Sequence, residues 1–245
     1  MLFRSNMVSE VNRLQSTLGR APRGIVVGGG LLGLEAAEGL KELGAEPTIL
    51  DVAPWLLSVE VDQGGGYAVN AQIKATGIDI ETGVFISGIN KDADGNVVSV
   101  SIADSPSEDA NIRTLPADMV VFGAGIRPND ELASAADMHM GERGGIVVND
   151  ACHTSDEHIW AIGEVACVLG RTWGLVAPAN AMADAVAANL LNDNEEAKVE
   201  EFDIATKLKF SGVQVAGFGD RRGTTEGCLE VLFADPARGM YQKIV

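Results

Sequence analysis

The feature that most constrains the fold is a glycine fingerprint between an apolar segment and a helix-forming segment. Residues 24–51 read GIVVGGGLLGLEAAEGLKELGAEPTILD, which contains the pattern Gly-x-Gly-x-x-Gly at Gly28, Gly30 and Gly33. The first glycine permits a tight turn, the second lets a pyrophosphate approach the backbone, and the third lets the helix pack closely on the strand. Because the unpaired N–H groups at a helix start attract phosphate, this pattern predicts a dinucleotide site.

An acidic residue closes the fingerprint at the end of the next apolar run. Asp51 lies 18 residues after Gly33. There its carboxylate can accept hydrogen bonds from both hydroxyls of an adenosine ribose. The same carboxylate would repel a 2′-phosphate, and residues 52–54 contain no Lys or Arg to bind one. The sequence therefore favours NADH over NADPH.

Composition limits the classes of partner. The 245 residues suffice for one large domain or two small ones, and a hydrophobic content of 46% is enough for an ordinary core. The net charge of −17 argues against a nucleic acid or an anionic membrane surface as partner, because both need positive charge. Residues 1–20 have apolar positions at helical spacing, which predicts an amphipathic helix rather than a signal peptide. We expect no membrane-spanning segment.

The cysteines and histidines show no pattern of a metal or redox site. Cys152, Cys167 and Cys228 have no C-x-x-C spacing, which argues against a redox-active dithiol and against an iron–sulfur or other metal site. The three histidines have no spacing typical of metal ligands either. Isolated, reduced thiols are typical of cytoplasmic proteins, so we expect a cytoplasmic protein without a metal.

Turn signals and apolar runs divide the rest of the chain. In chain order we expect a loop at 52–66, a helix at 67–76, a strand from 78, a hairpin at 84–103 that turns at 94–96, and a buried parallel strand at 118–122. These elements make a βαβαβ unit with a hairpin crossover. Beyond them we expect a connector at 123–129, short strands at 145–148 and 159–162, a helix at 180–191, an acidic linker at 193–201, and a segment of mixed strand character at 202–245.

Four motifs follow one another along the chain: GGGLLGLEAAEGL with ILD, then DMVVFGAGIRPN, then TSDEHIWAIGEVA, then WGLVAPANAMADAVAANLL. In this order they resemble the pyridine nucleotide–flavin oxidoreductases with two dinucleotide-binding domains, the family of glutathione reductase, rubredoxin reductase and the NADH oxidases. The resemblance covers residues 1–192. A narrower resemblance is to the large subunits of NAD(P)H-dependent assimilatory nitrite reductases. It is carried by IATKLKFSGVQVAGFGD at 204–220 and by Glu164, where the family more often has Asp.

The resemblance implies an α/β fold in which a Rossmann-like NAD(P)-binding domain interrupts a discontinuous FAD-binding domain. The implied parts are an N-terminal helix and linker at 1–22, the NAD(P)-binding domain at 23–125, the C-terminal half of the FAD-binding domain at 126–192, and a linker with the start of a small domain at 193–245. The first FAD half and the iron–sulfur and sirohaem modules have no counterpart in this sequence. We therefore do not expect the chain alone to bind FAD. A half domain with an open sheet edge can also associate into a homodimer.

The resemblance assigns the glycine fingerprint to the pyrophosphate of NADH and Asp51 to its adenosine ribose. The fingerprint positions are Gly28, Gly29, Gly30, Leu31, Leu32 and Gly33. Glu35 matches the acidic residue between nicotinamide and flavin and is the one candidate catalytic residue. Alternatively, Glu35 is only an exposed charge near the start of a helix, where the helix dipole favours an acidic residue. Gly123, Ala124 and Gly125 match the loop beneath the nicotinamide, and a plain turn explains them equally well.

Three further positions match the flavin site of the family. Gly163 and Glu164 match the segment whose carboxylate accepts hydrogen bonds from the ribityl chain. The alternative interpretation of Glu164 is a carboxylate exposed to solvent at the end of a strand. Pro178 lies between Ala177 and Ala179, before a helix whose first N–H groups would face the flavin pyrimidine. Without bound FAD that helix end has no such role.

The sequence leaves three functions open. The first is the NADH-binding part of a flavin-dependent oxidoreductase, in which hydride passes from NADH to FAD and electrons pass onward to nitrite. The second is an NADH-dependent reductase for a rubredoxin or ferredoxin, with a partner chain or domain supplying the other FAD half. The third is a non-catalytic nucleotide-binding fragment.

Overall fold

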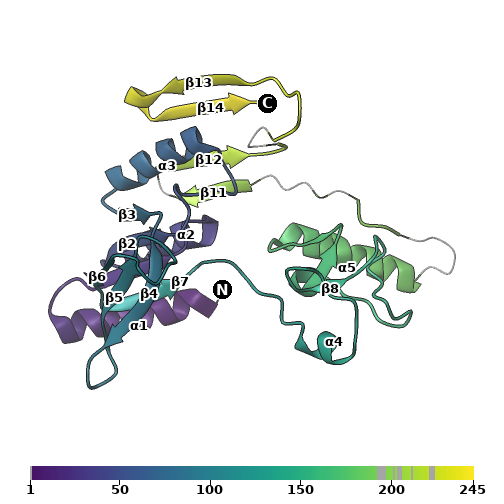
Figure 1. Ribbon diagram of the computed structural model, residues 1–245, viewed down its shortest axis with the longest axis horizontal. Coiled ribbons are helices and arrows are strands. Elements are labelled where there is room, and N and C mark those ends of the chain that lie inside the picture. The colour runs from purple at the N-terminus through teal and green to yellow at the C-terminus, as the bar shows by residue number, and fades with distance from the viewer. Residues whose placement is uncertain (1, 192–196, 201, 203–205, 211, 221–223) are drawn as a thin grey trace. The chain divides into compact units, whose positions relative to one another are not determined.

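The computed structural model describes residues 2–191, 197–200, 202, 206–210, 212–220 and 224–245 (Figure 1). The chain divides into two compact units, Met1–Gly125 with Ala205–Val245, and Ile126–Ile204. The acidic linker predicted at 193–201 falls largely outside the described residues. Within the described part of the chain, no helix is long and apolar enough to cross a membrane.

The first unit is built on a four-stranded parallel sheet in the order β3-β2-β1-β7. Its strands are β1 (Arg23–Val27), β2 (Glu46–Asp51), β3 (Asp79–Thr82) and β7 (Met119–Phe122). Every neighbouring pair is parallel. From β1 the chain first adds β2 and β3 on one side and later places β7 on the other, so the strand order reverses beside β1. This arrangement confirms the predicted α/β, Rossmann-like class.

Helices cover one face of this sheet, and an antiparallel sheet covers the other. The helices are α1 (Leu2–Leu18), α2 (Leu31–Glu42) and α3 (Gln63–Ala75), and the covering strands are β4 (Phe85–Lys91), β5 (Val97–Ala103) and β6 (Ile112–Pro116). Val26 of β1 lies in the core shared with the helices, whereas its neighbour Ile25 packs with Val100 and Ile102 of β5. Because side chains alternate across a strand, adjacent residues of β1 enter different cores.

Two hairpins from the end of the chain complete the first unit (Figure 1). Their strands are β11 (Thr206–Phe210), β12 (Val213–Gly217), β13 (Val231–Asp235) and β14 (Met240–Ile244), with a short 3-10 turn η2 (Pro236–Arg238) between the last two. Leu208, Phe210 and Val213 are buried in the same core as α2 and α3. The first hairpin is therefore an integral part of this unit.

The second unit is smaller and irregular. Its elements are α4 (Glu131–Ala135), β8 (Ile146–Val147), the 3-10 turn η1 (Gly163–Val165), β9 (Ala166–Val168), β10 (Arg171–Thr172) and α5 (Val176–Leu191). Strands β8 and β9 are parallel, and β10 pairs antiparallel to β9. Met182 of α5 packs with Trp173, Cys152 and Ala166 in the core of this unit.

The glycine run Gly64–Gly66 is helical, which corrects the predicted loop. Helix α3 begins at Gln63 because Asp62 precedes it as an N-cap, and Oδ1 of Asp62 accepts a hydrogen bond from the Gly65 N–H at 2.9 Å. An N-cap acid supplies the acceptor that the first N–H groups of a helix lack. Three successive glycines obscured this start, because glycine disfavours a helix interior.

Two other sequence predictions differ from the structure. Residues 159–162 form no strand: Trp160 makes one isolated bridge to His153, and Ala161 N–H donates to the Cys152 carbonyl at 3.1 Å, so the apolar run closes a local loop. The helix predicted at 180–191 starts earlier, at Val176, with Pro178 in its first turn, where a missing N–H has no cost. Strands β6, β9 and β10 were not expected.

Asp118 joins the amino ends of β1 and β7. Its carboxylate accepts hydrogen bonds from the Arg23 N–H at 2.7 Å and from the Arg20 guanidinium at 2.8 and 2.9 Å, and its side chain is 8% exposed. Burial raises the pKa of Asp118, but the hydrogen bonds from Arg20 and Arg23 outweigh burial and hold the pKa well below its usual range.

We expect Asp118→Asn to lower the free energy of unfolding by about 1–2 kcal/mol at neutral pH, because hydrogen bonds to a charged acceptor become neutral ones. A carboxyl whose folded-state pKa is depressed stabilises above its unfolded-state pKa and loses that contribution as pH falls through the folded-state value. Urea unfolding at neutral and acid pH measures both effects. The difference in free energy of unfolding between the unmodified protein and Asp118→Asn should shrink below pH of about 4. A difference that persists unchanged there contradicts this account.

Candidate nucleotide-binding site

The predicted nucleotide residues meet at the carboxyl edge of the parallel sheet. Gly28 follows β1, Asp51 ends β2, and Gly123 follows β7. The Gly28 N–H donates to the Leu50 carbonyl at 2.8 Å, and the Gly123 N–H donates to the Val27 carbonyl at 2.7 Å. The site therefore lies where the strand order reverses, which is the usual ligand position in open α/β sheets.

Three glycines of this edge are required by backbone packing. Gly28 has φ of +113°, and a Cβ there would lie 2.5 Å from the Gly123 carbonyl oxygen. A Cβ on Gly33 would lie 1.8 Å from the Gly28 carbonyl oxygen, and one on Gly123 would lie 3.0 Å from the Gly33 Cα. Helix α2 thus rests directly on the turns after β1 and β7, and no side chain fits between them.

Gly30 is different, because nothing in the protein requires it to be glycine. It has φ of −83°, and a Cβ built there meets no atom within 4 Å. Gly30 is exposed and is the N-cap of α2, without a side-chain cap. The first N–H groups of a helix have no partner within the helix. Open space over uncapped N–H groups fits a pyrophosphate, and Leu31, Leu32 and Gly33 contribute those groups.

Asp51 is held by two backbone N–H groups. Its Oδ1 accepts a hydrogen bond from the Ala53 N–H at 2.7 Å, and its Oδ2 accepts one from the Gly29 N–H. Each carboxylate oxygen can accept a further hydrogen bond, so the ribose hydroxyls still find acceptors. A Cβ on Gly29 would lie 2.5 Å from both Asp51 Oδ2 and Leu56 Cδ2, which explains the second glycine of the GGG run. Sequence reasoning had missed this role.

The remaining NADH positions lie on the elements that were expected. Glu35 is half-buried on α2. Ala124 and Gly125 are exposed beyond β7, and Gly125 has φ of +95° with no atom within 4 Å of a Cβ built there. Their predicted contacts with the nicotinamide stay predictions.

In the second unit, the predicted flavin residues lie on two adjacent segments. Gly163, with φ of +77°, donates its N–H to the Met182 sulfur at 3.4 Å and so attaches η1 to α5. Glu164 is exposed, whereas Pro178 is buried in the first turn of α5. The indole N–H of Trp160 is buried and has no hydrogen-bond partner among the described residues. The predicted roles of Gly163, Glu164 and Pro178 in a flavin site stay predictions.

Metal ligands and reactive thiols are two other kinds of group that serve in catalytic centres. No group of three or more His, Cys, Asp or Glu in the described ranges could hold a metal ion. Cys152 and Cys167 are buried, and burial followed by the charge of Asp150 raises the pKa of the Cys152 thiol. A raised pKa disfavours the thiolate, which is the reactive form of cysteine.

The chain belongs to the pyridine nucleotide-disulphide oxidoreductase family, whose sequence model matches residues 3–188. It is 37% identical over 238 residues to the nitrite reductase (NADH) large subunit of Escherichia coli K12, covering 97% of this chain and 27% of the relative. It is 39% identical over 238 residues to the nitrite reductase [NAD(P)H] large subunit of Klebsiella oxytoca, covering 97% of this chain and 24% of that protein. The chain thus spans about a quarter of the length of these relatives.

Solved structures show the same fold. The ferredoxin reductase for the CYP199A2 system from Rhodopseudomonas palustris superimposes with a TM-score of 0.73 at 28% identity, over 94% of this chain and 54% of that one. Putidaredoxin reductase in its covalent complex with putidaredoxin gives a TM-score of 0.72 at 27% identity, over 91% of this chain and 52% of that one. The predicted resemblance to the family, and to nitrite reductase large subunits within it, is therefore confirmed.

Proposed function

We propose that this chain binds NADH and forms the NADH-binding part of a flavin-dependent oxidoreductase of the nitrite reductase large-subunit type. The observation that carries the proposal is the contrast among the glycines. Backbone packing explains Gly28 and Gly33, and the Asp51 and Leu56 side chains explain Gly29, whereas no atom of the described protein excludes a Cβ at Gly30 and a bound pyrophosphate would do so. The relatives at 37% and 39% identity are named as nitrite reductases, which supports the narrower assignment.

In this proposal the start of α2 binds the pyrophosphate and Asp51 binds the adenosine ribose. The two N–H groups on Asp51 fix its carboxylate before the nucleotide arrives, so little ordering is left for binding. Glu35 lies beside the nicotinamide and the loop at Gly123–Gly125 lies beneath it. The protein supplies orientation and charge, while the cofactors carry the electrons.

Glu164 and the first turn of α5, with Gly163 and Pro178, form the part of a flavin site that this chain contributes. When bound, FAD would accept hydride from NADH and pass electrons toward nitrite. The exposed Glu164 carboxylate would bind ribityl hydroxyls, and the helix start would favour negative charge on the pyrimidine ring. A partner chain or domain would supply the other FAD half and the electron acceptor.

A second candidate function is an NADH-dependent reductase for a small iron–sulfur protein. The structural similarity to a ferredoxin reductase, at a TM-score of 0.73, favours it. A third, non-catalytic nucleotide binding, requires the same NADH site and no flavin. Adding FAD to the purified chain, and then a separately expressed first FAD half from a nitrite reductase, distinguishes non-catalytic nucleotide binding from the two flavin-dependent functions. Flavin absorbance that appears only with the added half supports a split FAD site, whereas flavin bound by the chain alone contradicts it.

Calorimetric titration with NADH and NADPH tests the nucleotide proposal directly. We expect NADH to bind at least about tenfold more tightly, because Asp51 repels a 2′-phosphate. Asp51→Asn should weaken NADH binding by about 1.5–3 kcal/mol, or about ten- to 150-fold, since the ribose loses a charged acceptor. Asn keeps an oxygen for one of the two backbone N–H groups.

Asp79→Asn is the matched control for this titration. Asp79 is exposed and begins β3, at the opposite edge of the same parallel sheet. This variant should bind NADH as the unmodified chain does. Equal affinity for the two nucleotides, or equal effects of the two substitutions, would show that Asp51 does not bind the ribose.

A further inference from the structure

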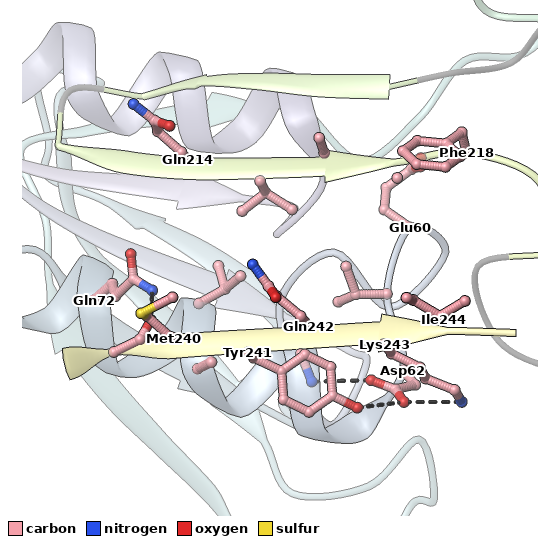
Figure 2. Close-up of a pocket in the computed structure, with 18 of the residues that line it drawn as sticks. Glu60, Asp62, Gln72, Gln214, Phe218, Met240, Tyr241, Gln242, Lys243 and Ile244 are labelled. Carbon is pink, nitrogen blue, oxygen red and sulfur yellow. Dashed lines mark hydrogen bonds and ion pairs between the residues drawn. The ribbon is translucent and has the colours of Figure 1, made fainter. Parts of the chain in front are cut away.

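The carboxyl-terminal hairpin contacts the start of α3 through Tyr241 and Lys243 of β14 (Figure 2). The Tyr241 hydroxyl donates to Oδ2 of Asp62 at 2.7 Å, and Nζ of Lys243 lies 3.1 Å from the same oxygen. Lys243 also pairs with Glu230 at 2.5 Å, and its side chain is only 10% exposed. These contacts border a cleft of about 870 Å³ between α3 and the two hairpins.

The two carboxylate oxygens of Asp62 bond two different parts of the chain. One carboxylate oxygen caps α3 through the Gly65 N–H, and the other accepts from the hairpin. Burial raises the pKa of Asp62, but the hydrogen bonds from Gly65, Tyr241 and Lys243 prevail and lower it. Burial and the hydrogen bond to Asp62 raise the pKa of Tyr241 to about 12, so its hydroxyl remains a donor at neutral pH.

The glycine run at the start of α3 is explained by two aromatic rings. A Cβ on Gly64 would lie 2.6 Å from the Tyr241 ring, and one on Gly66 would lie 2.1 Å from the Trp55 ring. Tyr241 comes from the hairpin, and Trp55 comes from the loop that follows Asp51. The first turn of α3 therefore packs its glycine backbone against both the hairpin and the loop after Asp51.

The loop that carries Trp55 is tied to the nucleotide site. The Leu57 N–H donates to the Gly29 carbonyl at 2.8 Å, and the Val61 N–H donates to the Leu57 carbonyl at 2.9 Å. The Leu56 N–H donates to the Asn70 side chain of α3 at 3.1 Å. The Asp51 carboxylate accepts a hydrogen bond from the N–H of the same Gly29. Both backbone polar groups of this fingerprint residue are therefore hydrogen-bonded, one to Asp51 and the other to the loop.

We propose that Asp62, Tyr241 and Lys243 are positioning residues for nucleotide binding. With the hairpin docked, α3 and the loop at 52–61 hold Gly29 and Asp51 in the arrangement that receives the nucleotide. With the hairpin released, Asp62 loses Tyr241 and Lys243, so the start of α3 that supports this loop is held less firmly and binding weakens. This inference rests on the proposed NADH site.

The most informative variant is Gly64→Ala. Alanine favours a helix more than glycine does, so α3 itself should gain stability, but the new Cβ displaces the Tyr241 ring. We expect Gly64→Ala to raise the Kd for NADH about fivefold or more, with Tyr241→Phe, which removes only the hydroxyl, giving a smaller increase. Calorimetric titration with NADH measures both. A merely structural glycine would leave the Kd unchanged.

Arg238→Gln is the control, because Arg238 pairs with Asp235 within the hairpin and is 78% exposed. It should bind NADH normally. Coupling is also reciprocal, so NADH should slow amide hydrogen exchange of residues 240–244 in the unmodified chain and not in Gly64→Ala. An unchanged Kd in Gly64→Ala and Tyr241→Phe, or equal exchange with and without NADH, overturns the inference. Failure of the unmodified chain to bind NADH overturns the proposed function instead.

Discussion

Replacing Gly30 by Asp should abolish measurable NADH binding without weakening the fold. A Cβ at this position meets no atom within 4 Å, and φ of −83° suits any residue. Aspartate is among the best N-cap residues, so α2 should be unchanged or slightly more stable. Its charge would face the pyrophosphate. Two unit charges 4 Å apart repel by about 4 kcal/mol at an effective dielectric constant of 20, or about 1,000-fold in Kd.

Gly30→Asn separates charge from volume in this experiment. Asparagine is nearly the same size as aspartate and caps helices equally well, but it carries no charge. We expect about a tenfold loss from crowding and competition for the N–H groups, well short of the loss with Asp. Calorimetry measures the Kd, and thermal unfolding without nucleotide checks the fold. If Gly30→Asp binds NADH as tightly as Gly30→Asn, the pyrophosphate does not lie at this helix start.

The sequence predicted those parts of the fold that local pattern determines. The apolar strands β1, β2 and β7, the helix after the fingerprint, and the hairpin around 94–96 each have a period or turn signal of their own. Strand β6 has no such signal, because it is mostly exposed and gains its place by pairing with β5. The start of α3 was missed for a related reason: its glycines are favourable only with Tyr241 and Trp55 against them.

Some residues of the candidate site could likewise be predicted from local pattern, and others could not. Gly28, Gly33 and Asp51 could be placed from spacing, because the βαβ fingerprint has a fixed geometry. The role of Gly29 could not, since it depends on the Asp51 carboxylate folding back onto its N–H. The contact of Asp62 with Tyr241 joins residues 179 positions apart. No local pattern reports such a contact, and only the folded chain places the hairpin beside α3.

Gly33→Ala should lower the free energy of unfolding of the first unit by about 3 kcal/mol, a large effect for a single methyl group. The new Cβ would lie 1.8 Å from the Gly28 carbonyl oxygen, so α2 must move away from β1. The oxygen belongs to the backbone of a packed layer and the backbone of α2 fixes the position of the Cβ, so no side-chain rotation relieves the overlap. Amide hydrogen exchange of β1 and β2 reports the free energy of unfolding of this unit.

Gly39→Ala, in the same helix, should have the opposite sign. A Cβ on Gly39 meets only the Met7 Cε at 3.8 Å, which is an ordinary contact. The higher helix propensity of alanine should therefore add about 0.5–1 kcal/mol to the free energy of unfolding. The two substitutions make the same chemical change six residues apart on α2. If both stabilise, close packing of the third fingerprint glycine is not what fixes α2 on the sheet, and the geometry inferred for the pyrophosphate site fails with it.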